Sequence, residues 1–144
     1  MRKGQLLVGI QFACLAVIIF FPGKDVGGAA SAAATLLELV AAIILVMGFL
    51  NLRDSLKITP EPKLNAKFVT HGIYKYIRHP IYSGLILFAI AEVINKQSLS
   101  IEIAALILVI DLVVKFKFED QLLRDAYPEA VEYQKRVGAL FPKP

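Results

Sequence analysis

Thirteen consecutive residues, Gly72 to Gly84, hold an unusual density of groups that could do chemistry. They read GIYKYIRHPIYSG and include three tyrosines, an arginine, a histidine and a proline. A plain membrane helix needs only one or two aromatic anchors and a basic residue at its edge. The stretch therefore predicts a binding or catalytic site.

A second charged segment lies some forty residues further along the chain, within the sequence VVKFKFEDQLL. The apolar runs 81–94 and 99–114 separate the two segments, and the polar residues 95–98 between these runs predict a tight turn. A helical hairpin would bring both segments to one end of the pair. The charged residues of the second segment are Lys115, Lys117, Glu119 and Asp120.

Together these groups suit a zwitterionic or nucleotide-like ligand. S-adenosylmethionine, for example, carries a sulfonium, an ammonium, a carboxylate and an adenine. Glu119 or Asp120 could receive the ammonium, cations or backbone N–H groups the carboxylate, and aromatic faces the sulfonium or the purine. A nicotinamide cofactor is equally compatible with these residue types.

The elements that position these residues are predicted to be membrane helices. Hydrophobic residues make up 57% of the 144 positions, mean hydropathy is +0.63, and charged residues are 19%, below the roughly 25% of soluble domains. We expect one all-α domain over residues 1–144, a polytopic membrane protein with about four transmembrane helices and a cytoplasmic helical tail. The four apolar runs are 5–21, 29–50, 81–94 and 99–114.

The two pairs of runs differ in length. The first two are long enough to cross a hydrocarbon core of roughly 30 Å as helices. The last two, at 1.5 Å per residue, span only about 20–25 Å, so we expect them to form a short helical hairpin.

The distribution of cations predicts the orientation. All Lys and Arg residues except Lys24 and Lys96 lie near the N-terminus, in the connection 51–79 or in the tail from residue 115. These regions share one side if four helices cross, and the positive-inside rule makes that side cytoplasmic, with both termini there. The net charge of +4 thus needs no nucleic acid. The N-terminal run resembles a secretory signal but is long for one, so we expect it to be retained.

Several single residues carry narrower expectations. Pro80 suits a first helical turn and should hold His79 in extended geometry outside the helix. Tyr76 fits an interfacial aromatic belt, and Cys14 fits a small apolar side chain. Asp111 precedes Lys115 by one helical turn and is expected to pair with it. Glu38, Glu92 and Glu102 also fall in or near apolar runs, and the last two lie close enough to the turn to reach water.

The motif G-x-Y-x-x-x-R-H-P-x-Y-x-G within residues 72–84 resembles the signature of the isoprenylcysteine carboxyl methyltransferase family, which is related to the phospholipid methyltransferases. The preceding Phe68-Val69-Thr70 is similar to that family's L-V-T lead-in. The tail elements E-D-x-L-L and A-Y-P-E-A-V-E-Y-Q-K-R-V, followed by Phe141-Pro142, resemble its C-terminal pattern. The resemblance covers residues 64–142, over half of the chain.

The resemblance implies an S-adenosylmethionine pocket and an acceptor site. Arg78 and Lys115 would face the acceptor's anionic group and, with Glu119, form the catalytic set. Four positions depart from the family pattern, and they put the acceptor or lid region in doubt more than the cofactor pocket: His71, Asp120, Pro128 and Ala130. The implied cofactor-binding residues are Phe68, Val69, Tyr74, His79, Pro80, Tyr82, Glu119 and Asp120.

We therefore expect methyl transfer from S-adenosylmethionine to a lipophilic acceptor at the membrane, without a metal. A carboxylate such as isoprenylcysteine is the favoured acceptor, and a phospholipid amine is the alternative. Two other classes stay open: a membrane reductase with a nicotinamide cofactor, and a non-enzymatic module that binds acidic lipids. The oligomeric state is open.

Overall fold

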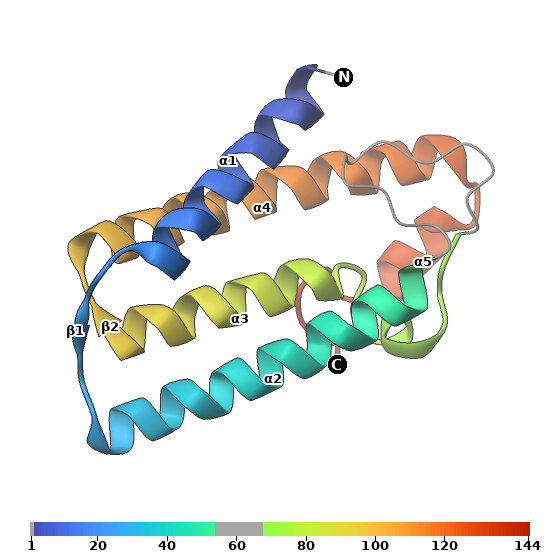
Figure 1. Ribbon diagram of the computed structural model, residues 1–144. Helices are drawn as coiled ribbons and strands as arrows, with labels where there is room; N and C mark the ends of the chain where they lie inside the picture. Colours follow the sequence, from blue (N-terminus) through green and yellow to red (C-terminus); the bar gives the residue numbers. More distant parts are fainter. Residues whose placement is uncertain (1, 54–67) are drawn as a thin grey trace.

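The computed structural model of this protein describes residues 2–53 and 68–144, and these are mainly helical (Figure 1). Part of the predicted connection 51–79 and the first residues of the resemblance over 64–142 lie outside the described residues. The helices are α1 (Arg2–Phe20), α2 (Gly28–Leu52), η1 (a 3-10 helix, Gly72–Lys75), α3 (Pro80–Asn95), α4 (Leu99–Ala126) and α5 (Ala130–Arg136). Two short strands are β1 (Lys24–Asp25) and β2 (Lys96–Gln97).

Consecutive long helices run in opposite directions, with α2 packed on α3 and α1 on α4 (Figure 1). At one end, β1 and β2 pair antiparallel, Lys24 opposite Gln97 and Asp25 opposite Lys96. This pairing confirms the predicted turn between α3 and α4 and ties it to the loop between α1 and α2. The charged end of α4 and the start of α3 meet at the other end.

The contacts between α1 and α4 confirm their antiparallel arrangement. Lys3 Nζ lies 4.7 Å from the centre of the Phe118 ring, and further along Gln11 meets Lys115. The buried core between the helices includes Ile18 and Leu108. The first turns of α1 therefore lie beside the charged half of α4.

Small residues let α2 and α3 approach closely. Gly84 is buried in α3, and a Cβ atom there would lie 2.6 Å from Leu45 Cγ and 3.2 Å from the Ala41 carbonyl oxygen. Gly48 of α2 faces Pro80 and Ile81 in the same way. Gly84 is therefore a close-packing glycine.

Helix α4 corrects one expectation about length. A short fourth helix over 99–114 was expected, but the helix continues without interruption through the charged segment for 28 residues, about 42 Å at 1.5 Å per residue. Lys, Glu, Gln, Leu and Arg in this segment are all good helix formers. Helix α3, with 16 residues, is as short as predicted.

Two helices in the described part of the chain, α1 and α2, are long and apolar enough to cross a membrane. Large apolar side chains on their outer faces are exposed, among them Phe12, Leu36 and Ile43. Helix α3 is apolar but shorter, and Glu102, Asp111 and Lys115 interrupt the apolar part of α4. Four spans and cytoplasmic termini therefore stay predictions.

Candidate functional site

Two segments distant in sequence meet where α3 begins and α4 carries its charges. Arg78 and His79 precede α3, and Glu119 and Asp120 lie on α4. His79 is the residue before the helix, with φ −125° and ψ 61°, and Pro80 takes the first helical position. The expectation that His79 lies outside the helix is thus confirmed, but the extended geometry is not, because its ψ of 61° lies outside the extended range. Its ring turns toward α4.

Asp120 joins the two basic side chains. Its Oδ2 lies 2.7 Å from Arg78 Nη2, and its Oδ1 lies 2.8 Å from His79 Nε2. The Asp120 side chain is only 8% exposed. Burial alone would raise its pKa, but the hydrogen bond and charge of His79, followed by those of Arg78, hold the pKa of Asp120 below its usual range. Asp120 is therefore an ionised anchor for Arg78 and His79.

Glu119 approaches the other side of the His79 ring. Glu119 Oε2 lies 3.3 Å from His79 Nδ1, and the Tyr82 hydroxyl donates to Glu119 Oε1 at 2.9 Å. The rings of His79 and Tyr82 stack, 5.5 Å apart and 4° from parallel. Burial would lower the pKa of His79, but its hydrogen bonds and charge interactions with Asp120 and Glu119 outweigh burial and raise it. The imidazolium form is thus favoured.

The C-terminal tail closes over Arg78. Arg78 Nη1 donates to the carbonyl oxygens of Gln134 (2.7 Å) and Val137 (2.6 Å). The backbone N–H groups of Arg78 and His79 donate to the carbonyls of Gly138 and Ala139, both at 2.9 Å. The segment after α5 therefore fixes the backbone on which both basic residues sit.

Gln134 is a site residue that the sequence analysis missed. Its Nε2 donates to the Asp120 carbonyl at 2.9 Å, and its Oε1 accepts from Arg124 Nη1 at 2.7 Å. The available signal was its place inside the tail motif A-V-E-Y-Q-K-R-V. Only the fold shows that this amide ties α5 to α4 beside Asp120.

An aromatic group extends the site away from the charges. Phe68 stacks on Tyr127 at 5.2 Å and meets Tyr133 edge-on at 5.3 Å. The Tyr133 hydroxyl donates to the Tyr74 carbonyl at 2.5 Å. Burial raises the pKa of Tyr133 to about 12, and it also raises that of Tyr74, which interacts with the Glu119 charge. Both phenols are therefore neutral hydrogen-bonding groups near pH 7.

Lys115 lies at the inner edge of the site. Its Nζ donates to Gln11 Oε1 of α1 at 2.7 Å and lies 5.1 Å from the centre of the Tyr82 ring. Lys115 and Asp111 were expected to pair, but they form no hydrogen bond. Neither Asp111 carboxylate oxygen has a hydrogen-bond partner among the described residues. Gln11, an amide within an apolar run, satisfies Lys115 instead and was also missed.

The other predicted site residues take different places. Pro80 is fully buried and packs toward Gly48 of α2, so its observed contribution is to fix the start of α3. Val69 is partly exposed beside Phe68 in the chain. Tyr76, 58% exposed, suits a surface aromatic. Glu92 pairs with Lys96 at 2.6 Å.

The positions that depart from the family pattern differ in burial. Ala130 is fully buried at the start of α5, whereas Pro128 and His71 are exposed. Asp120, in contrast, carries the most contacts with basic side chains in the site.

Two polar groups of the site have hydrogen-bonding capacity that a ligand could use. Glu119, 20% exposed, is more open than Asp120. Arg78 Nε is buried and has no hydrogen-bond partner within the described part of the chain. The site thus offers a carboxylate, an unused guanidinium N–H and stacked aromatic faces within one cluster. Across residues 2–53 and 68–144, no group of three or more His, Cys, Asp or Glu is placed to hold a metal ion.

Comparison with known proteins places these residues in context. The family described as phospholipid methyltransferase matches residues 29–130, which include both α3 and the charged part of α4. A relative in Cupriavidus metallidurans, the cobalt-zinc-cadmium resistance protein CzcN, is 32% identical over 80 residues. These residues are 55% of this chain and 37% of the relative, so the chain spans little more than a third of that protein.

Proposed function

This chain belongs to the phospholipid methyltransferase family, and on that premise we propose that it transfers a methyl group from S-adenosylmethionine to a lipophilic acceptor at the membrane. One observation carries the proposal. The two segments of the motif, 41 positions apart at His79 and Asp120, converge into one buried cluster at the end of the α3–α4 hairpin.

The residues present fit S-adenosylmethionine. When bound, this cofactor supplies an electrophilic methyl group on a sulfonium, and it leaves as S-adenosylhomocysteine after the methyl has moved. Glu119 offers negative charge to the ammonium. The rings of Tyr74 and Tyr82 belong to a cluster that suits a cation, since Lys115 Nζ already lies 5.1 Å from the centre of the Tyr82 ring. On the acceptor side, Arg78 Nε is a buried donor without a partner in the described residues, which suits the acceptor's anionic group.

The chain's contribution would be positioning and exclusion of water. Asp120 and the tail carbonyls hold Arg78, and Glu119 is oriented by Tyr82 and His79. A rigid, preorganised set of charges of this kind lowers a barrier mainly through proximity and electrostatics. We assign Arg78 and Lys115 to the acceptor's anionic group, and Glu119 to the cofactor side.

The favoured acceptor is a carboxylate such as isoprenylcysteine, and a phospholipid amine is the alternative. An ionised carboxylate needs no base, so its methylation rate should stay nearly flat above about pH 6, well past the ordinary carboxyl pKa. An amine must lose a proton, to Glu119 or to His79 once that ring is neutral, and its rate should rise with pH. Rates measured from pH 5.5 to 9 with each acceptor class separate the two, and a rising profile would overturn the carboxylate version.

The first test is thermal unfolding of the purified protein with and without S-adenosylhomocysteine. A ligand that binds only the folded state, at 100 times its dissociation constant, adds about 2.7 kcal/mol of stability. We expect a clear upward shift that Glu119→Gln reduces. Glu132→Gln is the matched control, because Glu132 is 69% exposed and its ion pair is with the exposed Lys135.

The rival classes give different results in the same assay. A module that only binds acidic lipids should show no shift with S-adenosylhomocysteine in a well-folded sample. A nicotinamide-dependent reductase should be stabilised by NADPH and should consume it with a lipid substrate. Either outcome would overturn the methyltransferase proposal.

A further inference from the structure

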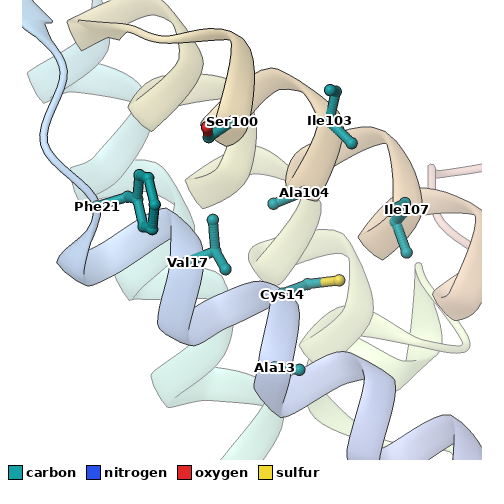
Figure 2. Close-up of a pocket in the computed structure, with 8 residues that line it drawn as sticks. All are labelled: Ala13, Cys14, Val17, Phe21, Ser100, Ile103, Ala104 and Ile107. Carbon is teal, nitrogen blue, oxygen red and sulfur yellow. The ribbon is translucent and has the colours of Figure 1, made fainter.

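A groove opens between α1 and α4, away from the charged cluster. Its volume is about 390 Å³, and its walls are apolar. Figure 2 shows Cys14 and Val17 of α1 facing Ile103 and Ile107 of α4, with Phe21 and Ser100 at the far end. Ile103 and Ile107 are 49% and 44% exposed, so the groove can be entered from the side.

Asp111 lies one helical turn beyond Ile107, toward the charged cluster. It is only 4% exposed, and both its carboxylate oxygens lack a hydrogen-bond partner among the described residues. A buried carboxylate without a partner is costly, and intramembrane carboxylates mark functional sites by default. Asp111 is therefore a candidate for contact with a molecule other than this chain.

The surroundings of Asp111 link the groove to the site. It lies one helical turn from Ile107, which lines the groove, and one turn from Lys115, whose Nζ lies 5.1 Å from the centre of the Tyr82 ring in the charged cluster. Lys115, one turn further, already donates to Gln11. Asp111 thus lies between an apolar groove and a polar site.

The lengths agree with an amphiphile lying along α4. Ser100 and Asp111 are eleven residues apart, or about 16 Å along the helix, roughly half of a hydrocarbon core of about 30 Å. The lining of the groove ends at Ile107, so an apolar chain laid in it would bring its polar group to within one helical turn of Asp111. A carboxylate in this position accepts hydrogen bonds from N–H or O–H groups.

We propose that the α1–α4 groove binds a single-chain amphiphile, whose hydrocarbon chain lies between Cys14 and Ile107 and whose N–H or O–H group donates to Asp111. In the function proposed above this amphiphile is the methyl acceptor, and only that last identification rests on the proposed function. Binding itself requires no cofactor.

The single cysteine of the chain serves as a natural reporter. The rate of Cys14 labelling by N-ethylmaleimide is measured in phosphatidylcholine nanodiscs, a lipid without N–H or O–H donors. Hexadecan-1-ol and its methyl ether are added as probes. They have the same hydrocarbon chain, but only the alcohol has an O–H donor. We expect hexadecan-1-ol to halve the labelling rate at roughly a tenfold lower concentration than the ether, because only the alcohol can donate a hydrogen bond to Asp111.

Variants of Asp111 test the polar contact. Asp111→Leu should abolish the preference for the alcohol, and Asp111→Asn, which keeps a carbonyl acceptor, should retain part of it. Glu102→Gln, an exposed carboxylate of the same helix, should leave the preference unchanged. Each variant is compared with itself without probe, so that any difference in the baseline reactivity of Cys14 cancels.

Three results would overturn the proposal: equal protection by the two probes in the parent, no protection by either, or an unchanged preference in a folded Asp111→Leu or Asp111→Asn protein. Because the assay contains no S-adenosylmethionine, it can succeed even if methyl transfer fails. A positive thermal shift with S-adenosylhomocysteine together with no protection of Cys14 would likewise reject the groove alone.

Discussion

Arg78 and Asp120, 42 positions apart in the chain, meet at 2.7 Å between Nη2 and Oδ2. The Arg78 side chain is 13% exposed and that of Asp120 is 8% exposed, so the pair is largely removed from water. His79 shares the same carboxylate. Asp120 therefore balances the charges of two basic groups. Its contact with the cofactor, which the resemblance implies, stays a prediction.

Replacement of Asp120 should destabilise the protein. Asp120→Ala would leave Arg78 and His79 without their shared counter-charge, and removing one partner of a buried ion pair typically costs 3–5 kcal/mol. We expect a loss of about 3 kcal/mol in the free energy of unfolding, measured by chemical denaturation in detergent. Glu132→Gln, which removes an exposed pair, should cause no measurable change. A loss as small as that of Glu132→Gln would show that Asp120 does not anchor the site.

The pH dependence of stability should carry the signature of His79. Because its pKa is raised in the folded state, its contribution is complete below the unfolded pKa of about 6.5 and is lost as pH rises through the folded pKa. The pKa of Asp120 is lowered, so its contribution is complete above about 3.9 and is lost as pH falls through the folded pKa.

Melting curves from pH 5 to pH 9 test the contribution of His79 to the stability of the folded protein. The parent should lose stability relative to His79→Gln as pH rises above about 6.5, the ordinary histidine pKa. A constant difference between parent and variant across this range would mean that His79 gains no proton affinity on folding.

Removal of the Tyr82 hydroxyl should loosen Glu119 without removing the aromatic stack. Tyr82→Phe keeps the ring beside His79 but deletes the 2.9 Å hydrogen bond to Glu119. We expect S-adenosylhomocysteine to bind roughly five- to tenfold more weakly, since a hydrogen bond to a charged group contributes about 1.5 kcal/mol or less in a partly exposed site. Isothermal titration measures the affinity. Tyr76→Phe, at an exposed tyrosine, is the control and should bind like the parent.

A glycine pair tests the packing of the helices. Gly84→Ala would place a Cβ 2.6 Å from Leu45 Cγ, and overpacking of this kind costs typically 1–3 kcal/mol. Gly9→Ala in α1 meets nothing within 4 Å and should be neutral or stabilising by up to about 1 kcal/mol. Unfolding of both variants in detergent gives the comparison. Equal effects at the two positions would contradict the close approach of α2 and α3.

The local elements were predictable from the sequence because they depend on short-range physics. Apolar runs predicted the helices of the hairpin, the polar residues 95–98 predicted their turn, and Pro80 predicted where α3 begins. The resemblance of the 72–84 motif and the tail predicted the family, which the match over residues 29–130 bears out. The length of α4 was underestimated, because the end of an apolar run does not end a helix whose charged residues are good helix formers.

The pairing of side chains was decided by the tertiary structure. The sequence identified Arg78, His79, Glu119 and Asp120 as neighbours at one end of the hairpin. It did not show that Asp120 takes both basic residues, that Gln134 ties the tail to α4, or that Gln11 rather than Asp111 satisfies Lys115. Each of these choices depends on the rotation of one helix against another, which close packing of residues such as Gly84 and Leu108 sets. A hydrogen bond requires its partners to meet within a few tenths of an ångström, and sequence spacing alone does not determine distances between separate helices.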